Sequence, residues 1–271
     1  MNTVQFSRGA SWFFGRSALL VAVFFLASGN VPAGGNARND REAGDCTSST
    51  TGAAVQLPET KLIIEHNSTD QDTGVHGAFD GVYWSELCVF DPTGQQVLGV
   101  RPQGQLKDLS MSGIFFESRE PPNDKLSITD LIAQFPEGLY PIRGTTLEGK
   151  RMKGAAKFTH DIPAAPTTLF PPDGAVVASS NLMVMWDHVT LTLTGRPLTT
   201  TGYEVIITKL VADDPNGFSR PTLDVHLPPS QTRLTVPSEF LEAGTPYELE
   251  VLALEVSGNQ TITVSFFETQ K

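Results

Sequence analysis

The chain has 271 residues and a formal net charge of −11, with 30 acidic side chains against 19 basic ones. This excess of negative charge repels phosphate backbones and anionic lipid headgroups, so it argues against a nucleic-acid partner and against docking on an anionic membrane surface. The two cysteines are too few for a disulfide-dense scaffold. The length suffices for one large domain or for two domains of ordinary size.

The first segment has the organisation of a secretory signal peptide. Arg8 and Arg16 give it a positive charge, and an unbroken apolar run follows at 18–27. This run is about half of the ~20 apolar residues that a membrane-spanning helix requires. Small residues after the run offer cleavage sites up to Ala37. We therefore expect residues 1–37 to be a signal peptide, which predicts a secreted, periplasmic or extracellular protein without stable membrane insertion after cleavage; the alternative is an uncleaved anchor.

Residues 38–56 are rich in Gly, Ala, Ser and Thr and hold almost no large apolar side chain. Such a composition is typical of a disordered spacer. This segment contains Cys46, whereas Cys88 lies in an alternating apolar run that predicts a buried strand. Export would place both cysteines in an oxidising compartment, where a disulfide is permitted. The sequence leaves two alternatives open, a Cys46–Cys88 disulfide or two unrelated thiols.

Residues 57–161 are predicted to form a β-sandwich domain of no recognised family. Runs rich in β-branched and alternating apolar residues predict strands at 61–66 and 79–90. The turn Asp91-Pro-Thr-Gly94 predicts a hairpin after the second strand, because Pro presets φ and Gly supplies a positive φ.

One segment of this domain has helical rather than alternating spacing. Its apolar residues are Leu126, Ile128, Leu131, Ile132 and Phe135. Ser127 is placed to cap the helix N-terminus and Pro136 to end it. The first domain is therefore expected to contain one short helix among its strands.

Residues 164–271 predict a second, all-β domain, which a segment rich in Pro and Ala at 162–166 separates from the first. Short apolar or alternating runs recur at 182–186, 203–208, 223–227, 233–236, 247–254 and 261–266. About seven strands in about 105 residues match the size of an immunoglobulin-like sandwich.

Four residues of the second domain stand in a characteristic order. Trp186 ends an early strand, Tyr203 opens the next, and Leu241 begins a Leu-x-x-Gly-Thr-x-Tyr pattern that ends at Tyr247. In these residues the domain resembles a fibronectin type III module. The resemblance implies that Trp186 and Tyr203 pack between two sheets and that the Tyr247 hydroxyl bonds back to the backbone in a tyrosine corner. It implies no specific activity, and no Arg-Gly-Asp adhesion tripeptide is present.

Five residues with oxygen-bearing side chains gather in and near one loop of the first domain. They are Glu65, Asn67, Asp70, Asp72 and Asp80. Ca²⁺ binds six to eight oxygen ligands, and exported proteins meet this ion at high concentration. We predict a Ca²⁺ site here. The alternative is a turn in which the Asp and Asn side chains bond to their own backbone.

The adjacent aromatic residues Tyr83 and Trp84 indicate a second candidate site. In a strand, neighbouring side chains point to opposite faces, so one of the two faces away from the core. Trp84 is the predicted binding residue: if it is the outward one, its ring would stack on a sugar or meet the second domain. The alternative is that a loop or the second domain covers both rings.

No recognised catalytic motif is present, neither a Gly-x-Ser-x-Gly elbow nor a phosphate-binding loop. Glu117 and Glu120 are paired carboxylates, but without a pocket they are equivalent to an acidic surface. The sequence therefore predicts a mainly β, secreted, non-enzymatic binding or structural module that contacts a protein or polysaccharide surface, with Ca²⁺ as its one possible cofactor. The alternative is an accessory or hydrolytic enzyme acting on polysaccharide or envelope material. Two convergent carboxylates within 57–161 would favour that alternative.

Overall fold

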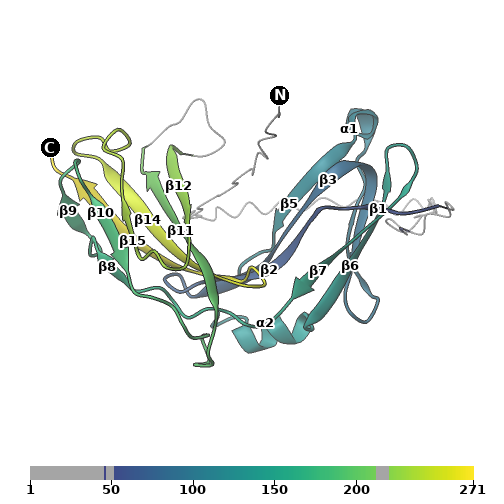
Figure 1. Ribbon diagram of the computed structural model, residues 1–271, viewed down its shortest axis with the longest axis horizontal. Helices are drawn as coiled ribbons and strands as arrows, with labels where there is room; N and C mark the ends of the chain where they lie inside the picture. The colour runs from purple at the N-terminus through teal and green to yellow at the C-terminus, as the bar shows by residue number, and fades with distance from the viewer. Residues whose placement is uncertain (1–45, 47–51, 212–219) are drawn as a thin grey trace, which may run out of the picture.

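The structure, a computed structural model, describes Cys46 and residues 52–211 and 220–271. The predicted signal peptide and most of the predicted spacer lie outside these residues. The described part is mainly β, as predicted, with fifteen strands and two short helices. No helix within it has the length and apolar character needed to cross a bilayer. Figure 1 shows its two halves, residues 52–161 and 164–271, as the arms of a V.

The N-terminal half is built around one long strand. Its elements are β1 (Val55–Gln56), β2 (Glu59–Asn67), β3 (Asp72–Phe90), β4 (Gln96–Val100), α1 (Gly104–Leu109), β5 (Met111–Glu117), α2 (Ile128–Gln134), β6 (Gly138–Thr146) and β7 (Arg151–Phe158). Strand β3 pairs antiparallel with β2, β4, β5 and β6 along its length. The apolar side chains enclosed by these strands form one core that includes Ile64, Phe79 and Tyr140.

The predicted helix is confirmed. It is α2, and the Ser127 side chain accepts a hydrogen bond from the Asp130 N–H at its N-terminus. The second helix, α1, was not predicted, because it buries none of its residues and so shows no apolar periodicity. The predicted spacer is two residues too long, since Val55 and Gln56 form β1 by pairing in parallel with β7.

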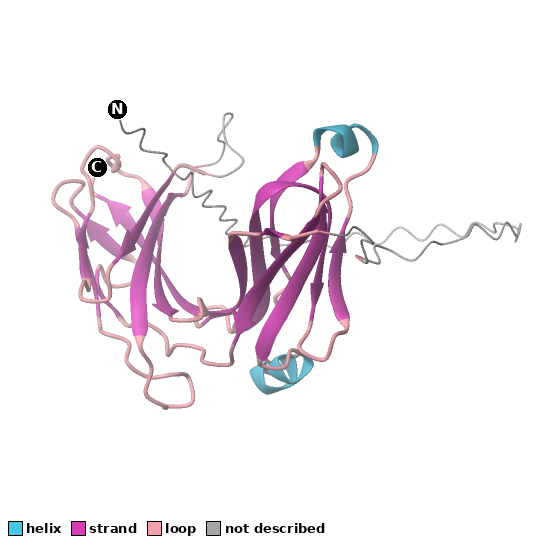
Figure 2. Ribbon diagram, turned by 45° about the vertical axis from the view of Figure 1, so that its right-hand side comes forward, coloured by secondary structure: helices cyan, strands magenta, loops and turns pink. Residues whose placement is uncertain are grey.

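The C-terminal half is a sandwich of two sheets. Its strands are β8 (Thr168–Phe170), β9 (Ala175–Val177), β10 (Met183–Trp186), β11 (Thr200–Lys209), β12 (Thr222–Leu227), β13 (Arg233–Thr235), β14 (Pro246–Glu255) and β15 (Gln260–Thr269). Strands β8, β10 and β13 form one sheet, and the order β15-β14-β11-β12 forms the other. Figure 2 shows the two layers, which enclose a core of their own. This arrangement is fibronectin type III-like.

The four residues that carried the resemblance lie in this core. Trp186 and Tyr203 make a T-shaped contact with ring centroids 5.4 Å apart. The Tyr247 hydroxyl accepts a hydrogen bond of 2.7 Å from the Glu242 N–H, which is the tyrosine corner. Leu241 packs in the same cluster.

One sheet continues through both halves. Strand β15 pairs in parallel with β2, with Gln260 opposite Glu65 and Ile262 opposite Asn67. Through this pairing twelve strands belong to a single sheet. Two cores therefore lie against one shared sheet. The hydrogen bonds of this sheet hold the two halves in the V-shaped arrangement of Figure 1.

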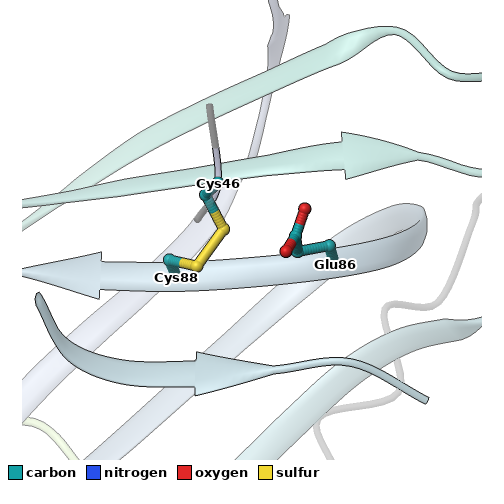
Figure 3. Close-up of side chains that lie close together, drawn as sticks. All are labelled: Cys46, Glu86 and Cys88. Atoms are coloured by element: carbon teal, nitrogen blue, oxygen red, sulfur yellow. A yellow bond between two sulfur atoms is a disulfide. The ribbon is translucent and has the colours of Figure 1, made fainter. Parts of the chain in front are cut away.

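The structure joins Cys46 to Cys88 by a disulfide, with Cα atoms 6.0 Å apart (Figure 3). Cys88 is fully buried on β3. The bond therefore ties the segment before β1 to the central strand of the N-terminal half. Glu86 lies beside the two sulfur atoms and pairs with Arg101. Because both sulfur atoms are bonded to each other, this group has no thiolate for a metal.

Candidate functional site

The shared sheet has one face that is turned away from both cores. In β11, Tyr203 and Val205 point into the core of the C-terminal half, so Glu204 between them points to the opposite face. In β2, Leu62 and Ile64 point into the N-terminal core, so Glu65 also points away. Figure 1 shows β8 and β10 on the outer side of one arm and β6 and β7 on the outer side of the other. The face that carries Glu65 and Glu204 is thus turned towards the space between the arms.

Carboxylate side chains dominate this surface, which we call the carboxylate face. Its acidic residues are Glu65, Asp72, Glu117, Glu120, Glu204, Asp224, Glu248 and Glu250, and His76 and His226 accompany them. A small apolar cluster of Ile206, Leu252 and Ile262 lies among them. In the strand pairing, no lysine or arginine stands opposite Glu65, Glu204 or Glu250 within the described residues. Apart from its two histidines, the ionisable groups named on this face are therefore all acidic.

A histidine between two carboxylates lies where the halves meet. His76 Nε2 is 3.0 Å from Glu120 Oε1, and His76 Nδ1 is 3.7 Å from Glu65 Oε2. The side-chain amide of Gln260 on β15 donates a hydrogen bond to Glu65. Glu65 and His76 are buried, and Glu120 is half-buried. Each polar group of this triad thus has a partner within the chain.

The environment of the triad moves its titration towards neutral pH. Burial raises the pKa of Glu65 to about 7, although the charge of His76 and the hydrogen bond from Gln260 oppose the rise. Burial lowers the pKa of His76, but the hydrogen bond to Glu120 and the nearby carboxylates outweigh it, so the net pKa is raised. Burial, then repulsion from Glu120 and Asp70, raises the pKa of Asp72 to about 6. Glu65 and Asp72 therefore take up and release protons near pH 6 to 7.

The C-terminal end of the carboxylate face holds a second cluster. Glu204 is only 2 % exposed, and its Oε1 lies 3.4 Å from Nε2 of His226. Burial, then the adjacent carboxylate of Asp224, raises the pKa of Glu204 to about 9. Burial, then the neighbouring Glu248, raises the pKa of Glu250 to about 8. Glu65 adds to both shifts, so the two ends of the face act on each other electrostatically.

The residues predicted to bind Ca²⁺ do not surround one point. Asn67 Oδ1 accepts hydrogen bonds from the N–H groups of Thr69 and Asp70, which is the Asx-turn alternative. Asp80 pairs with Glu59 at the far end of the β2–β3 hairpin, whereas Asp72 pairs with Asn67 at the turn. Glu65 is held by His76 and Gln260. Among the described residues, the structure brings Glu65 and Asp72 to one face and leaves Asp80 apart.

The prediction that Trp84 faces outward is wrong. Trp84 is fully buried in the N-terminal core, and Tyr83 is the exposed aromatic, at 63 %. The reason is the register of β3, which shifts on both sides of Trp84 where the strand leaves β5 and joins β6. Such irregularities change which face a side chain takes, and alternation alone does not reveal them.

A pocket of about 130 Å³ lies beside the segment that joins the halves. It is lined by Ala164, Ala165, Thr167, Asp187, His188, Val189, Thr190 and Leu191. Asp187 is its one carboxylate, so the pocket lacks a convergent pair of acidic groups. The carboxylate face is therefore the stronger candidate site.

The sequence predicted Glu65 as a Ca²⁺ ligand and showed Glu117 and Glu120 as a pair, but their convergence with His76 was not predicted, because these residues come from three separate segments. Glu204, Asp224 and His226 were not predicted as site residues. The one local signal was Glu204 itself, a lone carboxylate within the apolar run 203–207.

No protein-family model matches the chain, and no curated protein matches it. Among solved structures it is similar to chicken CNTN1 domains FN1–FN3, with 12 % identity, a TM-score of 0.32, and coverage of 80 % of this chain and 65 % of that one. It is also similar to the third fibronectin III domain of human KIAA0343, with 21 % identity, a TM-score of 0.31, and coverage of 42 % of this chain and 87 % of that one. At these TM-scores the fold assignment rests on the strand order and on the tyrosine corner.

Proposed function

We propose that the protein is an exported, non-enzymatic binding module whose carboxylate face binds a cationic surface of a partner outside the cytoplasm. The observation that carries this proposal is the gathering of eight carboxyl groups on that face, with no lysine or arginine paired opposite Glu65, Glu204 or Glu250 among the described residues. Glu65 and Glu250 have raised pKa values of about 7 and about 8, mainly through burial. A bound cationic group would favour their ionised forms, so binding would release protons and strengthen as pH rises.

The rigid joint between the halves supports binding by a preformed surface. Strand β15 is hydrogen-bonded to β2, and the Ser68 N–H donates to the Ile262 carbonyl. The Thr261 hydroxyl donates to the Pro163 carbonyl, which holds the connecting segment against the same strand. A surface that is ordered before binding loses little conformational entropy when the partner arrives.

Binding of a lysine-rich peptide to the purified chain tests the proposal. We expect saturable binding that weakens with added salt and that is weakened several-fold by Glu117→Gln or Glu248→Gln on the carboxylate face. Glu239→Gln, at an exposed position after β13, is the matched control and should leave binding unchanged. Equal losses in all three variants, or binding only to an uncharged oligosaccharide, would contradict the proposal.

One observation favours the hydrolytic alternative. Carboxylate oxygens of Glu65 and Glu120 and a ring nitrogen of His76 all lie within 4.8 Å of one another. Two convergent carboxyl groups, one with a raised pKa, are what acid–base hydrolysis of a glycosidic bond requires. Here His76 contacts one oxygen of each carboxylate and lies between the two groups, where the glycosidic oxygen would have to bind. Release of reducing sugar from envelope polysaccharide, abolished by Glu65→Gln, would establish the enzyme instead.

A further inference from the structure

Glu204, Asp224 and His226 form a compact group with three different donor atoms. In the pairing of β11 with β12, Glu204 stands opposite His226, and Asp224 is two residues from His226 on the same face. His226 Nε2 lies 3.4 Å from Glu204 Oε1 and 3.9 Å from Asp224 Oδ1. One donor atom from each residue lies within 4.8 Å of the other two.

Three of the four carboxylate oxygens of this group are buried without hydrogen-bond partners. Glu204 is 2 % exposed, and its Oε1 accepts no hydrogen bond. Both carboxylate oxygens of Asp224 are buried and accept none either. Buried carboxylate oxygens normally have hydrogen-bond partners, because burying a carboxylate without one costs on the order of several kcal/mol. Three such oxygens converge beside an imidazole nitrogen, which is an arrangement that a bound cation would stabilise.

The geometry matches the dimensions of a zinc site. Zinc bonds to histidine nitrogen at about 2.0–2.1 Å and to carboxylate oxygen at about 2.0–2.2 Å, so two ligands at a tetrahedral angle lie about 3.4 Å apart. The separations of His226 Nε2 from the two carboxylates, 3.4 and 3.9 Å, are near this value. Two oxygens and one imidazole suit Zn²⁺ better than Ca²⁺, which requires six to eight oxygens.

We propose that Glu204, Asp224 and His226 bind a divalent transition-metal ion, with Zn²⁺ as the best fit. The side chain of His226 is 66 % exposed, which leaves the ion a route from solvent and room for water at the fourth position. The ion would be held by the most deeply buried carboxyl group of the carboxylate face, that of Glu204. This inference goes beyond the proposed function, because metal binding by the purified chain stands whether or not a cationic partner exists.

The triad Glu65–His76–Glu120 provides a matched control within the same molecule. It also contains one histidine and two carboxylates. There, however, His76 is hydrogen-bonded to Glu120 at 3.0 Å, and Glu65 accepts a hydrogen bond from Gln260. The ligand atoms of this triad already have hydrogen-bond partners within the chain. A bound ion would therefore stabilise the triad less than it would stabilise Glu204 and Asp224.

The test is calorimetric titration of the tag-free, chelator-treated chain with Zn²⁺. We expect one ion per chain for the wild type and for His76→Gln, and a Kd raised at least about tenfold by His226→Gln and by Glu204→Gln. His226→Gln changes an exposed side chain, so its circular dichroism should match that of the wild type. Co²⁺ in place of Zn²⁺ should give tetrahedral d–d absorption bands that His226→Gln removes.

Four results would overturn the proposal. The first is an unchanged affinity in His226→Gln, and the second is a loss of affinity in His76→Gln alone. The third is a wild-type Kd of millimolar order, and the fourth is displacement of Zn²⁺ by a modest excess of Ca²⁺. Either of the last two shows only weak association with surface carboxylates.

Discussion

Asn259 Oδ1 in the C-terminal half accepts a hydrogen bond of 2.8 Å from the backbone N–H of Ile64 in the N-terminal half. The same side chain donates through Nδ2 to the carbonyls of Thr159 and Asp161, at 3.0 and 3.3 Å. Asn259 is fully buried. One amide thus connects β2, the segment after β7 and the turn before β15, the three elements that meet where the arms of the V join.

Asn259→Ala should destabilise the protein by about 2–4 kcal/mol, because it leaves a buried N–H and two buried carbonyls without partners. Urea denaturation followed by tryptophan fluorescence measures the change. Gln95→Ala, which removes an amide from an exposed turn, is the control and should cost less than about 0.5 kcal/mol. Calorimetry of the wild type should show one transition, and separate transitions in Asn259→Ala would show that this residue couples the halves.

Tyr247→Phe removes the hydroxyl of the tyrosine corner and leaves the Glu242 N–H without its 2.7 Å partner. The ring remains to pack against Phe267, so the expected loss is that of one hydrogen bond, about 1–2 kcal/mol. The midpoint of chemical denaturation reports it. Tyr83→Phe, at an exposed tyrosine, should shift that midpoint by a negligible amount. An equal effect of both changes would contradict a specific role for the corner.

Replacing both Cys46 and Cys88 by alanine should destabilise the protein by about 4 kcal/mol, since the bond closes a loop with a sequence separation of 42. Thermal unfolding with and without reductant measures the effect. Reductant should lower the transition temperature of the wild type and leave that of the double variant unchanged. If reductant does not change the transition temperature of the wild type, even after it has been added to the denatured protein, then Cys46 and Cys88 are two free thiols.

The stability of the folded state should fall as the pH rises from about 5 to about 7. Glu65 has a raised pKa of about 7 in the folded state against an ordinary value of 4.5, so the folded state holds more protons in this range. The pKa of His76 is also raised, so its contribution is complete below 6.5 and is lost as the pH passes the folded value. Both groups therefore act in the same direction.

The urea midpoint, measured at several pH values, tests this dependence. Glu65→Gln should make the fall in stability less steep, because glutamine keeps the shape of the side chain but does not titrate. Glu59→Gln, at an exposed position on the same strand, should follow the wild-type profile. Stability that instead rises between pH 5 and 7 would contradict the raised pKa values of Glu65 and His76.

Local patterns were sufficient where the structure depends on neighbours in the chain. Ser127 caps α2 because its hydroxyl reaches the N–H of Asp130 three residues later, and this spacing is visible in the sequence. The order Trp186, Tyr203 and Tyr247 predicted a fibronectin type III-like sandwich, since each residue fills a position that this fold requires. The prediction that Trp84 faces outward was wrong because two register shifts in β3 interrupt the alternation of its side chains.

By itself, the sequence determined the mainly β class, the strands, the capped helix and the residues of the tyrosine corner, because these follow from side-chain periodicity and short-range geometry. Only the tertiary structure decided that Cys46 bonds to Cys88 and that β15 pairs in parallel with β2. It also decided that carboxylates from distant segments share one face. These features depend on contacts between segments as much as 195 residues apart. Such contacts form only when the burial of two cores brings the strands together, and no local pattern encodes them.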